Sequence, residues 1–154
     1  MKKFFLKIIF FFLSRAIRAV VKLDYYAKKE LDNFDESYVI KLKIWPEKPS
    51  ICFIVKNNSF KKSKKYPDAD LTIYFKSIES ALLLLTGKMS IEQGYSEHRF
   101  LVKGDLFKSM SFIRILHIVE YYLFPKFITN KILYEKPSTS SNKFRVYLKI
   151  LFGI

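Results

Sequence analysis

The period of the hydrophobic pattern changes along this chain, and that change limits the fold more than any other feature. Segments of alternating or continuous apolar residues predict strands, and later segments with helical spacing predict helices. The predicted strands cover residues 38–44, 51–55, 71–75 and 97–103, and the predicted helices cover 78–86 and the stretch from a cap at Asp105 towards Phe124. This order predicts an α+β domain whose mostly antiparallel sheet has helices packed on one face.

The first 23 residues form a segment with six cations and no acid. On a helical wheel the cations fall on one stripe, while phenylalanine and aliphatic side chains fill the rest. The uncharged stretch from Ile8 to Ser14 is too short to span a bilayer, and no small-residue cleavage site of a secretory signal follows it. The pattern predicts a basic amphipathic helix at a membrane interface. The alternative is a helix that covers the core and exposes a basic stripe. The predicted membrane-contact residues are Lys3, Phe4, Phe5, Lys7, Ile8, Phe12, Arg15, Arg18 and Lys22.

The net charge of +14 predicts an anionic partner, either lipid head groups or nucleic acid, unless it serves solubility alone. Residues 56–67 add five lysines and no acid, and they are predicted to form a solvated loop. The cations are mixed with phenylalanine and isoleucine, and no nucleic-acid-binding motif is present. The sequence therefore favours an anionic membrane surface over nucleic acid.

Residues typical of catalysis and metal binding are scarce. The chain has two histidines, one cysteine (Cys52, predicted to be buried) and four glycines, which leaves no metal-ligand spacing and no phosphate-binding loop. The polar cluster Glu97-His98-Arg99 lies in a predicted strand, where His98 would face away from its neighbours. We therefore expect a non-catalytic protein with no metal and no cofactor.

A series of short motifs resembles a known family. After Asp68 the chain has a strand, an apolar helix, the turn Gly87-Lys88-Met89, the segment 100–105 (FLVKGD) and a second apolar helix. This order resembles the sterol carrier protein type-two family over about residues 38–120. The resemblance implies a five-stranded, largely antiparallel sheet, helices on one face and an apolar tunnel between them for fatty acyl chains, sterols or other long lipids. It implies no catalytic residues.

The helix at 78–86 is too apolar to have one side in water, which independently favours an apolar cavity over an active site. Each residue that could line such a cavity could equally be part of an ordinary core. The predicted lipid-binding residues are Ile73, Phe75, Leu82, Leu85, Met89, Phe100, Val102, Met110 and Ile113.

Three parts are predicted along the chain: a membrane-contact helix and connector at 1–34, a lipid-binding domain at 35–125 and a basic apolar tail at 126–154, whose end fits a helix or a strand. The predicted function is to bind or present a long apolar lipid at an anionic membrane surface, as a cytoplasmic, peripherally associated protein with a protein partner as a further candidate. The alternatives are a nucleic-acid-binding module and an accessory subunit of a membrane-associated assembly, such as one for isoprenoid-quinone synthesis.

Overall fold

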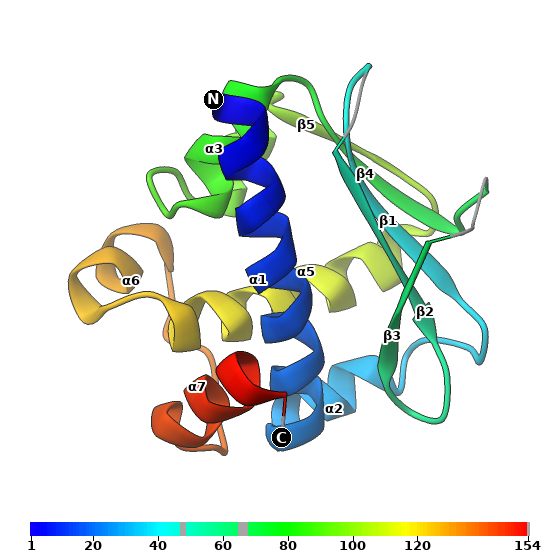
Figure 1. The fold of residues 1–154 in the computed structure, drawn as a ribbon, viewed down its shortest axis with the longest axis vertical. Helices are drawn as coiled ribbons and strands as arrows, with labels where there is room; N and C mark the ends of the chain where they lie inside the picture. Colours follow the sequence, from blue (N-terminus) through cyan, green and yellow to red (C-terminus); the bar gives the residue numbers. More distant parts are fainter. Residues whose placement is uncertain (47–48, 65–67, 154) are drawn as a thin grey trace.

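A computed structural model describes residues 1–46, 49–64 and 68–153 of the chain. Parts of the predicted turn at 46–50 and of the predicted loop at 56–67, and the last residue of the tail, lie outside the described residues. Five strands of the described part form one sheet in the order β3-β2-β1-β4-β5 (Figure 1). The strands are β1 (Val39–Ile44), β2 (Ser50–Val55), β3 (Phe60–Ser63), β4 (Leu71–Phe75) and β5 (Phe100–Lys103).

The sheet is mixed, so the predicted mostly antiparallel arrangement is wrong. The central strands β1 and β4 are parallel, with Leu42 opposite Ile73, whereas the other pairs are antiparallel. The reason is that the chain does not return from β3 by a hairpin. Ala69, which lies two residues before β4, packs against Val39 and Ile54 on the outer side of the sheet. A connection over one face brings the next strand in parallel to β1.

Strand β3 lies inside the stretch that was predicted to be a solvated loop. Only Phe60 is buried in it, and Lys61 and Lys62 are exposed. Lysines are common on edge strands, where they prevent pairing with further strands. The lysine run therefore indicates an edge strand and not a loop.

The helices of the described part all lie on one face of the sheet, as predicted (Figure 1). They are α1 (Lys2–Leu23), α2 (Tyr25–Leu31), α3 (Ile78–Leu85), α4 (Ile91–Ser96), α5 (Leu106–Leu123), α6 (Lys126–Ile132) and α7 (Lys143–Phe152). The predicted caps are confirmed, because Ser77 accepts a hydrogen bond from Ser80 N and Asp105 accepts one from Lys108 N. Helix α4 lies in a stretch for which the sequence predicts no helix or strand. The end of the tail, predicted to be either a helix or a strand, is the helix α7.

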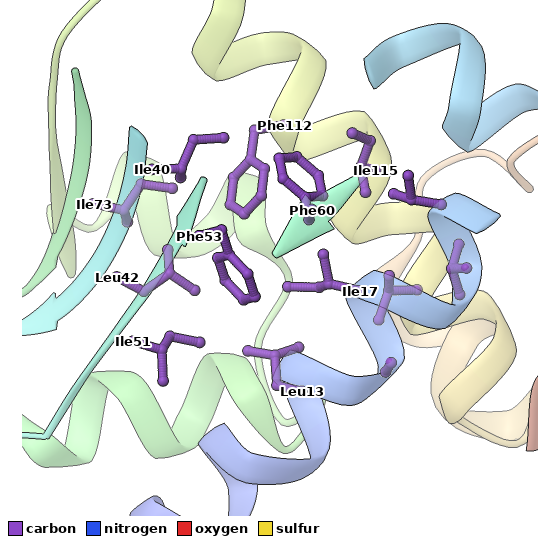
Figure 2. Close-up of a cluster of buried hydrophobic side chains, with 14 of the residues drawn as sticks. Leu13, Ile17, Ile40, Leu42, Ile51, Phe53, Phe60, Ile73, Phe112 and Ile115 are labelled. Carbon is purple, nitrogen blue, oxygen red and sulfur yellow. The ribbon is translucent and has the colours of Figure 1, made fainter. Parts of the chain in front are cut away.

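Helix α1 crosses the middle of the helical layer and is part of the core. Its inward face contributes a row of buried side chains that meets the inward side chains of the sheet and of α5 (Figure 2). Phe60 stands at the centre of this contact, with its ring 5.9 Å from that of Phe53 and 6.1 Å from that of Phe112. Such aromatic pairs bury large areas and fix the relative positions of their elements. The inward face of α1 therefore agrees with the alternative prediction, that of a helix that covers the core.

The C-terminal tail is held by a buried hydrogen-bond network. The Asp24 carboxylate caps α2 and also accepts hydrogen bonds from Tyr122 Oη (2.6 Å) and Ser140 N (2.8 Å). Val146 and Ile150 of α7 belong to the same core cluster as α1 and the sheet. The predicted subdivision at residues 34 and 125 stays a prediction.

Candidate functional site

A small apolar pocket of about 60 Å³ lies between the inner face of the sheet and helices α3, α4 and α5. The sheet supplies its floor, the helices supply its walls, and α1 closes one side. Its lining residues are Leu13, Leu42, Ile73, Phe75, Leu84, Leu85, Ile91, Phe100, Ile113, Leu116, Val119, Glu120, Leu123 and Phe124. This is the place at which the family resemblance implies an apolar tunnel.

The structure brings five of the nine predicted lipid-binding residues together in this pocket, namely Ile73, Phe75, Leu85, Phe100 and Ile113. The other four do not line it. Met89 is buried in the core, Leu82 and Val102 are partly buried against the core, and Met110 is 46% exposed. Met110 lies on the outer side of α5 because the neighbouring Phe112 turns into the core.

Sequence reasoning missed most of the wall that α5 provides. The sequence does contain a pattern that could have identified this wall. Four of its residues recur at helical spacings of three and four, namely Ile113, Leu116, Glu120 and Leu123. Leu13 had no such signal, because its place in the pocket depends on how α1 packs against the sheet.

The burial of the lining residues shows where the pocket opens. The members on the sheet and on α1, such as Leu42 and Leu13, are buried. The partly exposed members belong to α3, α4, α5 and the residue that follows α5, and they are Leu85, Ile91, Ile113, Leu116, Glu120, Leu123 and Phe124. The mouth therefore lies between α3 and α4 on one side and α5 on the other.

Among the described residues that line the pocket, Glu120 alone has a polar side chain. The residue as a whole is partly buried, but its Oε2 atom is shielded from solvent and has no hydrogen-bond partner among the described residues. Burial, and to a smaller degree the charge of Glu92, raises the pKa of Glu120 to about 8. At neutral pH this carboxyl group is therefore mostly protonated and can donate a hydrogen bond.

Three charged or titratable residues of α5 contact acidic residues of neighbouring helices or connections. Lys108 forms an ion pair with Asp35, and Arg114 Nε lies 2.8 Å from Glu30 Oε1. His117 Nε2 lies 3.0 Å from Glu92 Oε1 without the alignment of a hydrogen bond. Burial lowers the pKa of His117, and Glu92 opposes that effect.

The outward face of α1 changes character along its length. Its first half exposes Phe4, Phe5, Ile8, Phe11 and Phe12 together with Lys3 and Lys7. Its second half carries Arg15, Arg18 and Lys22, of which the two arginines are only partly exposed. Seven of the nine predicted membrane-contact residues are thus exposed, and the other two, Arg15 and Arg18, are partly exposed.

The predicted polar cluster at residues 97–99 is a turn, because β5 begins only at Phe100. Arg99 Nε lies 3.0 Å from Glu97 Oε2 at the surface, and His98 has a positive φ of 54°. No group of residues in the described part could hold a metal ion. None of its helices is both long enough and apolar enough to cross a membrane.

No family model matches this chain, and neither does any curated protein. Solved structures with a similar fold include UbiJ-SCP2, a ubiquinone synthesis protein, which is 15% identical over 61% of this chain and 77% of its own, with a TM-score of 0.43. Sterol carrier protein 2 from Yarrowia lipolytica in its apo form is 21% identical over 66% of this chain and 84% of its own (TM-score 0.45). Sterol carrier protein 2 like 2 from Aedes aegypti is 11% identical over 66% and 96% (TM-score 0.39). All three are sterol carrier protein 2 domains, the family that the sequence motifs resemble.

Proposed function

We propose that this protein binds the apolar part of a long lipid in the pocket between the sheet and helices α3, α4 and α5. The observation that carries the proposal is the pocket itself, whose lining is apolar except for one carboxyl group at its mouth. Apolar pockets with few, well-placed polar groups are typical of sites for small apolar ligands. The resemblance of the sequence motifs to a lipid-binding family supports the same function.

The pocket must widen to accept such a ligand. An engineered protein cavity of about 150 Å³ accommodates benzene, whereas this pocket measures about 60 Å³. The partly exposed residues at the mouth, among them Leu85 and Leu123, can move with the least loss of packing. We therefore expect α3 and α4 to separate from α5 when a lipid chain enters.

Glu120 orients the lipid in this proposal. Its protonated carboxyl group lies at the mouth and donates a hydrogen bond to a neutral oxygen, such as a hydroxyl or carbonyl group, at the polar end of the ligand. A ligand that ends in a carboxylate would bind less well, because a third acidic group beside Glu92 and Glu120 is unfavourable in an apolar site.

The exposed phenylalanines of α1 support a further part of the proposal, that the protein exchanges its lipid at a membrane surface. Helix α1 packs against α3, which borders the mouth, and Lys2 at its start forms an ion pair with Glu79 of α3. Exposed aromatic side chains flanked by lysines are typical of helices that insert into the headgroup region of anionic bilayers.

A pocket-filling substitution tests the lipid site. Ile113→Trp adds bulk at the mouth and is expected to lower the affinity for a fluorescent long-chain alcohol by about tenfold or more, because the indole occupies the space of the chain. Leu148→Trp, at an exposed position of α7, is the matched control and should bind as the unsubstituted protein does. Equal affinity of both variants, or no detectable binding by the unsubstituted protein, would contradict the proposed function.

A further inference from the structure

A second hollow in the surface is unrelated to the apolar pocket. It is a groove of about 730 Å³ formed by the second half of α1, the turn before β3, β3 itself and α7. None of its lining residues lines the apolar pocket. Seven of them are cations, which we call the basic groove: Arg15, Arg18, Lys22, Lys56, Lys61, Lys62 and Lys149.

The two arginines are held in place by backbone carbonyl groups. Arg15 Nη2 donates a hydrogen bond to Leu151 O (3.2 Å), and Arg18 Nε donates one to Ser14 O (3.1 Å). Arg15 also stacks on the Phe11 ring, 5.6 Å from its centroid. A guanidinium has five N–H donors, so each arginine keeps donors for a ligand while its position is already set. Binding an anion here would order fewer side chains than binding at free surface lysines.

The charge of the basic groove is not neutralised within the described part of the chain. None of the seven cations belongs to an ion pair formed by the described residues, and no carboxylate is among the described residues that line the groove. Cations gathered around one groove repel each other, since screening at physiological salt acts over about 8 Å. An anion in the groove would relieve this repulsion.

An unpartnered polar atom also points to a ligand. Ser59 lines the groove, and its Oγ atom is buried without a hydrogen-bond partner in the described part of the chain. A buried hydroxyl without a partner costs about 1–3 kcal/mol, so such groups normally have one. Rotation of the Ser59 side chain towards the groove would let this hydroxyl donate a hydrogen bond to an oxygen atom of a bound anion.

We propose that the basic groove binds a phosphate-bearing anion with two or more negative charges. Two phosphate oxygens can accept hydrogen bonds from the planar guanidinium group of one arginine. An anion with two or more negative charges suits a groove that is lined by seven cations. The volume exceeds what a single phosphate needs. The phosphate can belong to a soluble diphosphate compound or to a lipid headgroup, and the proposal does not depend on the lipid pocket.

Thermal unfolding with inorganic diphosphate tests the site. Diphosphate should raise the midpoint of unfolding by several degrees relative to sodium chloride of the same ionic strength. The groove variant Arg18→Gln/Lys61→Gln/Lys149→Gln should bind diphosphate about tenfold or more weakly, because three of seven attractive charges are gone. The control Lys28→Gln/Lys103→Gln/Lys131→Gln changes the net charge equally at exposed sites outside the groove and should keep the effect. A lysine-only groove variant, Lys22→Gln/Lys61→Gln/Lys149→Gln, gives the same test if loss of Arg18 prevents folding.

Vesicles distinguish the two sources of phosphate. If vesicles of cardiolipin, whose headgroup carries two phosphates, and phosphatidylcholine bind the protein but not the groove variant, and diphosphate displaces the bound protein, the ligand is a lipid headgroup. If diphosphate binds and the vesicles do not compete, the ligand is soluble. An equal diphosphate effect in the groove and control variants, or no effect of diphosphate or vesicles, would overturn the proposal. So would a single-stranded oligonucleotide that binds the groove far more tightly than diphosphate does at physiological salt.

Discussion

Glu120 places a carboxyl group at the edge of an apolar pocket, where its charged form is unfavourable. In the unfolded chain this group has its ordinary pKa of 4.5, and in the folded protein its pKa is about 8. The folded state therefore binds the proton more tightly, and this contribution to stability is complete only below about pH 4.5. It is lost as the pH rises towards 8. A protein would retain such a residue for the hydrogen bond that the protonated group can donate to a ligand.

The pH dependence of unfolding tests this account of Glu120. Between pH 6.5 and 8 the free energy of unfolding should fall by up to about 1.4 kcal/mol per pH unit, since the unfolded state releases one proton more. Burial lowers the pKa of His117, and a histidine with a lowered pKa makes the free energy of unfolding rise with pH, so His117 cannot produce this fall. Glu120→Gln should flatten the dependence, whereas Glu135→Gln at an exposed position should leave it unchanged. Chemical denaturation at several pH values measures the slope, and equal slopes for the protein and Glu120→Gln would contradict the account.

At the scale of the element, the inward and outward faces of α1 differ in composition and in what they contact. Its inward face supplies core residues such as Phe10 and Ile17, and its outward face exposes aromatic side chains followed by arginines. Removing the helix would therefore test folding and membrane contact together. Point substitutions on the outward face separate them.

Phe4→Ser/Phe5→Ser is expected to lower binding to phosphatidylglycerol-containing vesicles by about tenfold, because two apolar rings no longer enter the bilayer. Both side chains are more than half exposed, so the free energy of unfolding should change little. Phe107→Ser/Phe127→Ser removes two equally exposed rings elsewhere and serves as the control. Vesicle flotation measures the binding. Unchanged flotation of the α1 variant would remove the membrane part of the proposed function.

At the scale of the whole molecule, the first and last helices of the described part pack against each other. Helix α1 packs against α7, and Tyr122 and Ser140 both donate hydrogen bonds to Asp24 at the end of α1. Nine residues of α1 are buried, so this helix supplies a large part of the core. We expect residues 35–125 to need α1 for a stable fold.

Deletion of residues 2–23 should abolish cooperative unfolding, since the apolar face of the sheet loses the helix that covers it. Urea denaturation followed by circular dichroism measures this, with Phe4→Ser/Phe5→Ser as the variant that keeps the helix. Retained cooperative unfolding of the deletion variant would instead support a boundary at residue 34.

Much of the local structure was determined by the sequence alone. Alternation at 38–44 and 71–75 specified strands and their inward faces, and the caps at Ser77 and Asp105 specified where two helices begin. These features depend on neighbours within a few residues, which is why they can be read from one sequence.

Other features were decided only by the tertiary structure. The parallel pairing of β1 with β4 depends on a crossover between β3 and β4, which are not neighbours in the sheet. Lys61 and Lys62 belong to an edge strand because the neighbouring Phe60 packs in the core against Phe112. The apolar pocket and the basic groove each combine segments more than 50 residues apart in the chain. A sequence pattern indicates which side of a helix or strand is apolar or charged. Which of these sides come into contact depends on the packing of segments that are far apart in the chain.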